Sequence, residues 1–264
     1  MHIVSQLPIS MPEKNFAGYY KLLRDAYNLT KETNTQVTIQ DVPKGVSDPQ
    51  FLNYYGPREL NGQEMVRCML QAEKRGFDAI AGACYFDTGI STVSNLLSIP
   101  VVGPAQASMN IASLIGAQFA VITTEPLWVP QLKDFILQSE YVMKSLQICP
   151  VKSLQTPMHT TIEHLFAGAY EPILEDFQAR AQELIDQGAD VIIAGCGLIS
   201  PLFTIKSMQE IDGVPIIDPM VASLKFAEFM VRLQKINVNM NTSQGKFAHP
   251  STEIAQNIIT QFQN

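Results

Sequence analysis

Several features that assign proteins to common classes are missing from this sequence. No stretch approaches the roughly 18 consecutive apolar residues of a membrane-spanning helix, so we expect no membrane partner. No cluster of Lys and Arg offsets the net charge of −7, and a surface of that sign repels phosphate backbones, so we expect no nucleic-acid partner. The first ten residues, MHIVSQLPIS, have neither the basic region nor the long apolar run of a secretory signal, which favours a cytoplasmic location.

Motifs for metals and cofactors are also missing. None of the four cysteines lies in a Cys-x-x-Cys pair, which argues against a zinc ribbon or a thioredoxin-like motif. His159 and His164 are not four residues apart, as the zinc-binding motif on a helix requires. The sequence has no Gly-x-Gly-x-x-Gly segment and no P-loop. We therefore expect neither a metal nor an organic cofactor, and we expect free thiols in a reducing compartment.

The composition and the apolar pattern predict an α/β fold. Apolar residues make up 46% of the chain and charged residues 16%, a globular balance with material for a sizeable core. Short apolar runs alternate with longer segments of helical spacing, which is typical of mostly parallel sheets. The predicted strands are His2–Val4, Gln36–Gln40, Asp78–Ala83, Ile99–Gly103, Phe119–Thr123, Asp190–Ala194 and Val214–Ile217. The predicted helices are Phe16–Thr30, Gln63–Arg75, Ala105–Ile115, Val129–Glu140, Ile173–Asp186, Val221–Gln234 and Ser251–Phe262. The polar and aromatic segment Pro43–Pro57 is a candidate lid or interface loop.

An internal repeat is the most informative feature. GFDAIAGAC at 76–84 matches GADVIIAGC at 188–196, because each has Gly, an Asp two residues later, an apolar strand and then Cys. Two more pairs follow in the same order, with IVSQLP (from Ile3) matching VITTEP (from Val121) and IPVVGP (from Ile99) matching VPIIDP (from Val214). The offsets of 112, 118 and 115 residues correspond to a lobe length and not to the short period of a solenoid.

The repeat predicts two pseudo-symmetric α/β lobes, each with a short, mostly parallel sheet flanked by helices. We place lobe 1 at residues 1–117 and lobe 2 at residues 118–235. Residues 236–264 form a C-terminal extension, whose helix, 251–264, we expect to pack back on lobe 1. The active site is predicted in the cleft between the lobes.

Cys84 and Cys196 are the candidate catalytic residues. Each ends a buried strand, and ligands of parallel α/β sheets sit beyond the carboxyl ends of the strands. The turn after each cysteine can lead into a helix N-terminus, an environment that lowers a thiol pKa, so we expect a lowered pKa for at least one of them. Two thiols facing each other across one ligand suit a 1,1-proton transfer, in which one removes a proton and the other returns a proton to the opposite face. The carbanion formed between these steps needs an adjacent carbonyl or carboxylate held by fixed donors.

A structural role is the alternative for any cysteine, since a buried cysteine is often a small, inert core residue. The matching repeat positions of Cys84 and Cys196 favour catalysis over packing. Cys68 and Cys149 have no repeat partner, so we expect both to be structural.

Five segments resemble the aspartate/glutamate/hydantoin racemase superfamily, and its hydantoin racemase branch in particular. They are Cys84–Gly89 (CYFDTG), Ile99–Ala107 (IPVVGPAQA), Ala120–Thr124 (AVITT), Gly188–Gly197 (GADVIIAGCG) and Gly213–Asp218 followed by Val221–Glu228. The resemblance spans about Leu60 to Val231. It implies two pseudo-symmetric α/β lobes, the two cysteines as acid/base pair, no cofactor and a homo-oligomer.

The sequence departs from that family at three places. Leu7-Pro8-Ile9-Ser10 stands where hydantoin racemases have an Asn-Pro-Asn-Thr-like segment, Thr88 stands for a proline, and Gln106 stands for a glutamate. A less polar first loop would suit a larger or more apolar ligand.

The candidate substrate-binding residues lie at these strand ends and turns. Hydroxyl groups at strand ends can bind a carboxylate or imide oxygen, although threonine is also simply a good strand residue. A carboxylate in the first turn can contact the ligand or cap the turn. The candidates are Pro8, Ser10, Tyr85, Asp87, Thr88, Thr123, Thr124 and Gly197.

The prediction is therefore a cofactor-independent racemase or epimerase acting next to a carbonyl or carboxylate, on an amino acid, a hydantoin or a related small acid. The expected partner is a small molecule that is anionic or contains an imide. The alternatives on the same scaffold are a maleate isomerase-like enzyme and an arylmalonate decarboxylase-like enzyme, the second of which uses one cysteine. A non-catalytic binding protein for a small acid is the third.

Overall fold

The computed structural model describes residues 1–262, which form two compact units. Unit 1 comprises residues 1–12, 31–104 and 223–262, and unit 2 comprises residues 13–30 and 105–222. Both units are therefore discontinuous in sequence. The lobes predicted at 1–117 and 118–235 group residues by the repeat, whereas the units group them by packing, and the lobe boundaries stay a prediction. Of the predicted extension 236–264 and helix 251–264, the last two residues lie outside the described residues.

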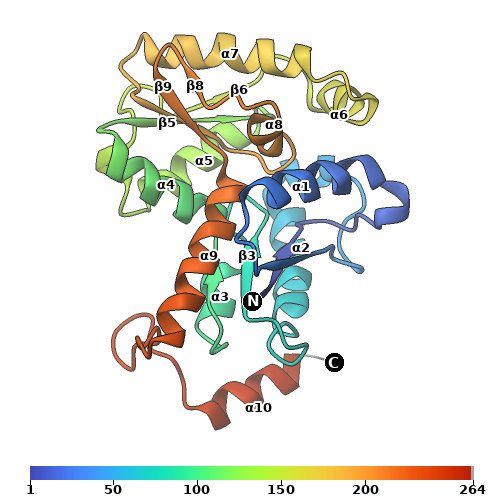
Figure 1. The fold of residues 1–264 in the computed structure, drawn as a ribbon, viewed down its shortest axis with the longest axis vertical. Coiled ribbons are helices and arrows are strands. Elements are labelled where there is room, and N and C mark those ends of the chain that lie inside the picture. The colour runs from blue at the N-terminus through green and yellow to red at the C-terminus, as the bar shows by residue number, and fades with distance from the viewer. Residues whose placement is uncertain (263–264) are drawn as a thin grey trace. The chain divides into compact units, whose positions relative to one another are not determined.

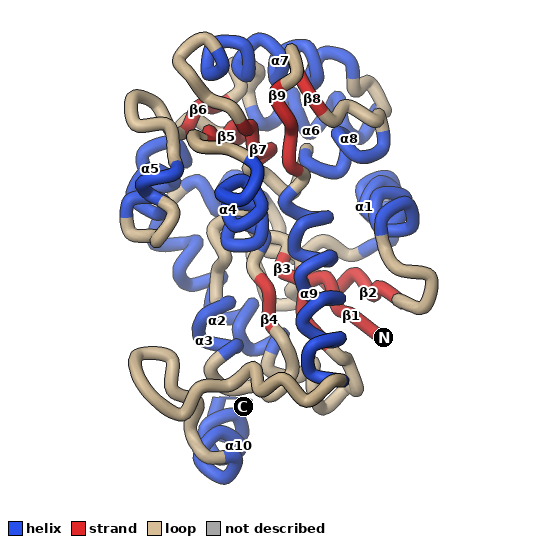
Figure 2. The backbone as a smooth tube through the Cα atoms, turned by 60° about the vertical axis from the view of Figure 1, so that its left-hand side comes forward, coloured by secondary structure: helices blue, strands red, loops and turns tan. Residues whose placement is uncertain are grey.

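Unit 1 contains a parallel sheet with the strand order β2-β1-β3-β4. Its central strand β3 is labelled in Figure 1, and all four strands are labelled in Figure 2. Its strands are β1 (His2–Gln6), β2 (Gln36–Gln40), β3 (Ala79–Gly82) and β4 (Val101–Val102). All four residues of β3 are buried, as expected for a central strand covered on both faces.

Unit 2 repeats this order as β6-β5-β7-β9 and adds β8 antiparallel to β9. Its strands are β5 (Phe119–Thr123), β6 (Val151–Ser153), β7 (Val191–Ala194), β8 (Glu210–Ile211) and β9 (Val214–Ile217). The repeat in the sequence thus corresponds to a repeat in topology, with β3 and β7 as matching central strands. The predicted fold class, two mostly parallel sheets flanked by helices, is confirmed.

Helices connect the strands, as Figure 2 shows by colour. They are α1 (Ala17–Thr30), α2 (Tyr55–Met69), α3 (Ile90–Ser94), α4 (Pro104–Ile115), α5 (Trp128–Leu137), α6 (Met158–Ala167), α7 (Glu171–Ile185), α8 (Ser200–Ile205), α9 (Pro219–Lys235) and α10 (Thr252–Phe262). Three short 3-10 helices are η1 (Glu13–Asn15), η2 (Pro49–Asn53) and η3 (Val142–Lys144). Within residues 1–262, none of the helices has the length and the apolar character needed to cross a membrane.

The core of unit 1 lies between the sheet and helices α2, α3 and α10. Met65 and Met69 of α2, Val93 of α3 and Ile80 of β3 are buried in one cluster. Ile259 of α10 belongs to the same cluster and is 2% exposed, so the C-terminal helix packs within unit 1.

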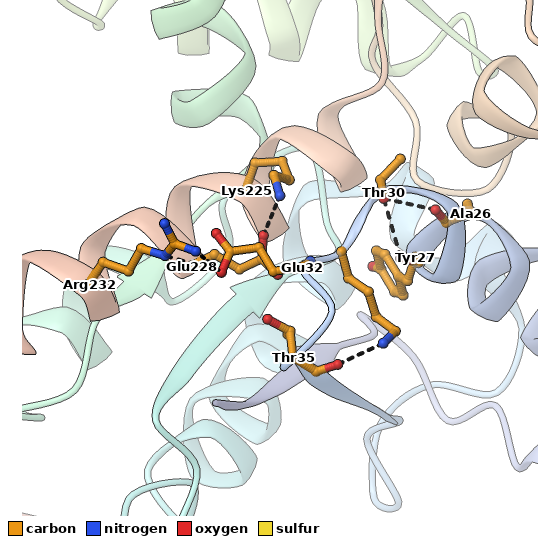
Figure 3. A network of polar contacts seen from close by, with 9 residues as sticks. Ala26, Tyr27, Thr30, Glu32, Thr35, Lys225, Glu228 and Arg232 are labelled. Carbon is orange, nitrogen blue, oxygen red and sulfur yellow. Dashed lines mark hydrogen bonds and ion pairs between the residues drawn. The ribbon is translucent and has the colours of Figure 1, made fainter.

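A buried carboxylate holds α9 to the loop before β2 (Figure 3). Glu228 is fully buried, accepts the backbone N–H of Glu32 at 2.8 Å and pairs with Lys225 at 2.5 Å. Arg232, one turn further along α9, pairs with the Glu32 carboxylate at 2.6 Å. Burial raises the pKa of Glu228, but the hydrogen bonds from Lys225 and the Glu32 N–H act against it, and the net pKa is lowered.

The predicted helix Gln63–Arg75 differs from the observed helix. α2 begins eight residues earlier, at Tyr55, and ends at Met69, after which residues 70–75 form turns. Pro57 lies in the first turn of α2, where its missing N–H has no carbonyl to bind, so the helix accepts it. The candidate loop 43–57 therefore contains η2 and the first turn of α2.

Candidate functional site

Cys84 lies two residues beyond the end of β3 and is half-buried. Its sulfur lies 3.6 Å from the hydroxyl of Thr88. Its carbonyl accepts the N–H of Asp87 at 2.9 Å, which closes the turn that follows the strand. The turn thus curls back so that the side chain four residues ahead contacts the thiol.

The turn after Cys84 depends on backbone conformations of the left-handed region. Asp87 has φ 49° and Gly89 has φ 75° before α3 begins. The carboxyl group of Asp87 lies against Gly103, where any Cβ would overlap it. Gly103 directly follows β4, so the carboxylate occupies the end of the neighbouring strand.

Helix α2 borders this turn with one buried face. Gly62 leaves room for Thr88, whose Cγ2 would lie 2.8 Å from a Cβ at that position. Arg58, one turn earlier, is 7% exposed, and its guanidinium lies over the ring of Phe86 at 4.0 Å. The sequence reasoning did not identify Arg58, because buried arginine has no signature in a single sequence.

Asn61, on the same face of α2, fixes the loop after β1. Its amide donates to the carbonyl of Pro8 at 2.6 Å, and its side-chain oxygen accepts the N–H of Val46 at 2.8 Å. Ser10 donates its N–H to the carbonyl of Val46 at 2.8 Å. The predicted binding residues Pro8 and Ser10 are thus held in a defined loop and are partly exposed.

Cys196 lies two residues beyond β7, the same offset that Cys84 has from β3. It is 6% exposed, and the hydroxyl of Thr124 donates to its sulfur at 3.3 Å. Its carbonyl accepts the N–H groups of Ile199 and Ser200 at 3.1 and 3.0 Å, which begins α8. A threonine hydroxyl therefore contacts each of the two thiols.

Tyr19 is a further residue of this region that the sequence reasoning did not identify. Its hydroxyl donates to the carbonyl of Gly197 at 2.8 Å. The tyrosine is buried, and burial followed by neighbouring groups that include Cys196 raises its pKa well above the usual value, so it stays a neutral donor. In the sequence, the segment 16–30 shows only apolar and aromatic residues at helical spacing, which predicts a helix but does not single out Tyr19.

Asp218 directly follows β9 and takes the place in unit 2 that Gly103 has in the repeat of unit 1. It accepts the hydroxyl of Thr204 at 2.7 Å and the N–H of Met220 at 2.9 Å. Burial raises the pKa of Asp218 against the lowering effect of these hydrogen bonds. A carboxylate thus lies at the end of β4, which neighbours β3, and another at the end of β9, which neighbours β7. The two aspartates, Asp87 and Asp218, occupy different positions of the sequence repeat.

The remaining predicted residues are buried. Tyr85 is 4% exposed, and Thr123 and Thr124 are fully buried at the end of β5. The Thr123 hydroxyl has no hydrogen-bond partner among the residues that the structure describes. Gly197 is buried as well, while Asp87 and Thr88 are partly exposed.

The expected lowering of a thiol pKa does not hold for Cys84. Burial raises its pKa, although the Thr88 hydroxyl, the Phe86 N–H and the Arg58 charge each act to lower it. α3 begins only at Ile90, so a turn and not a helix N-terminus follows Cys84, and burial has the largest effect on the pKa of the thiol.

No metal centre is assigned. Among residues 1–262, no group of three or more His, Cys, Asp or Glu side chains is placed to hold a metal ion. Cys68, on α2, is half-buried against the core, and Cys149 donates to the carbonyl of Val151 at 3.5 Å.

Two curated proteins are similar in sequence across most of the chain. Hydantoin racemase from Rhizobium meliloti is 30% identical over 186 residues, which cover 70% of this chain and 71% of that protein. Hydantoin racemase from Pseudomonas sp. (strain NS671) is 28% identical over 222 residues, 84% of each chain. A family model described as Asp/Glu/Hydantoin racemase matches residues 26–227.

Solved structures share the fold at lower identity. Allantoin racemase from Pseudomonas fluorescens superposes with a TM-score of 0.76 at 20% identity, covering 95% of this chain and 97% of that one. Glutamate racemase from Campylobacter jejuni subsp. jejuni gives a TM-score of 0.52 at 16% identity, covering 100% and 98%. The family match across 26–227 confirms the resemblance first seen in the two cysteine segments: the chain belongs to the Asp/Glu/hydantoin racemase family, and it is an enzyme of the isomerase class.

Proposed function

We propose that this protein is a cofactor-independent racemase or epimerase in which Cys84 and Cys196 are the acid/base pair. One observation carries the proposal: each thiol lies two residues beyond the matching central strand of its sheet, and a threonine hydroxyl contacts each sulfur. Packing alone does not require a cysteine with a hydroxyl partner at both repeat positions. Cys68 and Cys149, which lack a repeat partner, serve as the internal comparison.

The reaction is a 1,1-proton transfer. One thiolate removes the proton from a carbon next to a carbonyl, and the electron pair of the broken C–H bond moves into the carbonyl to form an enolate. The opposite thiol then donates its proton to the other face of that carbon, and the carbonyl re-forms. The mechanism requires the two sulfur atoms to reach opposite faces of one carbon. The raised pKa of Cys84 keeps that thiol protonated in the resting protein, which suits the proton donor.

Threonine hydroxyls tune the two thiols. Thr88 lowers the pKa of Cys84 against the effect of burial, and Thr124 donates to the sulfur of Cys196. Each hydroxyl stabilises a thiolate when it forms, so both are positioning residues for proton abstraction. Asp87 and Ser10, which are partly exposed, are proposed to contact the substrate, while Tyr85, Thr123 and Gly197 support the thiols from the interior.

The proposed substrates are 5-substituted hydantoins or related small cyclic imides, with amino acids as the second class. The support is the sequence similarity to two hydantoin racemases across 70% and 84% of the chain. The loop at Leu7–Ser10 lacks asparagine, so the substituent at the reacting carbon is expected to be larger or more apolar than a short polar group.

The test is deuterium incorporation in D2O, followed by NMR, for a panel of 5-alkyl and 5-aryl hydantoins and of amino acids. The expected result is loss of the signal of the carbon-bound proton in at least one substrate, faster than in buffer alone. Cys68→Ser and Cys149→Ser should retain this exchange, whereas Cys84→Ser and Cys196→Ser should lose racemisation by orders of magnitude. Full racemisation in Cys84→Ser would contradict the two-thiol proposal.

A further inference from the structure

Arg58 is a buried cation whose hydrogen bonds are incomplete. The residue is 7% exposed, and its Nη1 is buried without a hydrogen-bond partner anywhere in residues 1–262. Two aromatic rings lie near the guanidinium, that of Phe86 at 4.0 Å and that of Tyr55 at 5.8 Å. Burial lowers the pKa of Arg58, and the neighbouring Glu59 carboxylate acts to raise it against that larger effect. An unpaired donor on a buried charge costs free energy of folding, so packing alone gives no reason for an arginine at this position.

The surroundings of Arg58 belong to the site around Cys84. Phe86, on which the guanidinium lies, is two residues beyond Cys84 in the same turn. The positive charge of Arg58 acts to lower the pKa of the Cys84 thiol, against the larger effect of burial, which raises it. Asn61 and Gly62, next to Arg58 on the buried face of α2, contact the loop at Pro8 and the turn at Thr88.

We propose that Arg58 binds an oxygen atom of the substrate next to Cys84, through its unpaired Nη1. The oxygen is one that carries negative charge in the substrate or gains it during the reaction, such as an imide oxygen, a carboxylate or the enolate oxygen. A guanidinium stays charged at all working pH values and offers a planar set of N–H donors, which suits such an oxygen. Donors fixed beside a developing enolate stabilise the transition state more than the ground state.

The inference rests on the proposed function for the identity of the ligand, but its main test does not need a substrate. Cys84 is alkylated with iodoacetate, which is an anion, and with iodoacetamide, which is neutral and of nearly the same size. Both reagents need the thiolate, so the ratio of the two rates cancels any change in thiol pKa and reports the anion preference of the site. Mass spectrometry of the digested protein gives the ratio separately for Cys84 and Cys196.

The expected result in the native protein is a ratio at Cys84 well above that of free 2-mercaptoethanol at the same pH and salt. In Arg58→Met, which keeps an apolar stem against Phe86, the ratio should fall about tenfold. Tenfold corresponds to about 1.4 kcal/mol, which lies between the attraction of two unit charges about 4 Å apart in water, about 1 kcal/mol, and near a protein surface, about 4 kcal/mol. Arg58→Lys, which keeps the charge, should retain most of the ratio.

Arg75→Gln is the matched control, because Arg75 is a second arginine of unit 1 that lies over an aromatic ring, Phe77, at 5.1 Å. Arg75→Gln removes one positive charge from a place other than the site around Cys84. The ratio of the iodoacetate and iodoacetamide rates at Cys84 should therefore stay within twofold of the native value. A ratio at Cys84 that does not exceed that of 2-mercaptoethanol overturns the inference without any variant. A ratio within twofold of native in Arg58→Met also overturns it.

Racemisation separates this inference from the proposed function. Arg58→Met should reduce kcat/KM by about 10²–10³-fold, as removal of a fixed donor to a developing oxyanion does, while Arg58→Lys recovers part of the loss. If Arg58→Met loses the alkylation ratio but the native protein racemises nothing in the panel, the oxygen-binding role stands and the proposed reaction fails. If racemisation is present and the ratio is unchanged by Arg58→Met, the reaction stands and this inference fails.

Discussion

A methyl group added at position 103 gives a direct test of the turn that holds Cys84. Gly103 follows β4, and a Cβ there would lie within 3.0 Å of the carboxyl carbon and both oxygens of Asp87, closer than real Cβ atoms approach. Gly103 has no positive φ, so the backbone itself accepts alanine and the overlap is the only penalty. Gly103→Ala must therefore displace the Asp87 carboxylate, with the strain of an overpacked site, about 1–3 kcal/mol.

The double variant isolates the cause. Asp87→Ala removes the carboxylate that the new methyl group meets, so Asp87→Ala/Gly103→Ala should be less destabilised than the sum of the two single variants by about 1 kcal/mol or more. Urea unfolding followed by circular dichroism measures the free energies. Iodoacetamide labelling of Cys84 in the same variants reports whether the turn has moved.

The control for the added methyl group is Gly18→Ala. Gly18 lies in the first turn of α1, and a Cβ there would have nothing within 4 Å, so the variant should be neutral or stabilised by up to about 1 kcal/mol. If Gly103→Ala is as stable as Gly18→Ala, the placement of Asp87 is refuted. Additive effects in the double variant would show that the strain lies elsewhere.

Three further predictions concern the site and its support. Glu228→Gln should lower the free energy of unfolding by about 1–2 kcal/mol at pH 7, as loss of a charged hydrogen bond does. Because the pKa of Glu228 is lowered in the folded protein, this contribution is present above the unfolded pKa and is lost as the pH falls through the folded pKa. The urea midpoints of the native protein and the variant should therefore converge in acid. Thr88→Val should raise the pKa of Cys84 further and shift its alkylation profile to higher pH, and an unchanged profile would remove Thr88 from the thiol site. Racemisation should survive dialysis against EDTA, and a loss restored by one specific metal would contradict the two-thiol mechanism.

The central strands were predictable because they are short apolar runs bounded by Gly, Asp and Pro. β3 and β7 follow from GFDAIAGAC and GADVIIAGC, and both sheets then share one strand order. The edge strand β6 was not predicted. It has three residues, one of them Lys152, and so shows no apolar run.

The start of α2 was missed because Gly56, Pro57 and Gly62 look like helix breakers. Pro57 is harmless in the first turn, and Gly62 is retained in the helix where a side chain would meet Thr88. Local helix propensity depends on the neighbouring sequence alone, whereas Gly62 is explained by its contact with Thr88, which lies 26 residues further along the chain. The membership of α1 in unit 2 depends likewise on packing, including the bond from Tyr19 to Gly197.

The cysteines were predictable from the repeat, and Thr88 and Thr124 were both candidate binding residues, but their contacts with the thiols were not predictable, because the repeat does not place the two threonines at matching positions. Thr88 follows its cysteine by four residues, while Thr124 comes from the end of β5. The carboxylates also come from different positions of the repeat. Asp87 belongs to the turn after Cys84 and its carboxylate lies at the end of β4, whereas Asp218 itself directly follows β9. In each unit a hydroxyl contacts the thiol and a carboxylate lies at the end of the neighbouring strand, but the residues that supply them do not match in the sequence repeat. Matching the repeats in the sequence therefore does not reveal these contacts.

The most direct test of the two-thiol account is the stereochemistry of deuterium incorporation in the two cysteine variants. Serine is a far weaker acid than cysteine and does not replace it as a base near neutral pH. Cys84→Ser and Cys196→Ser each keep one thiol, which faces one side of the substrate. Each variant should therefore exchange the proton of one enantiomer with retention, and the two variants should act on opposite enantiomers. If one variant is inactive towards both enantiomers and the other is near native, a single thiol carries the reaction and the account is contradicted.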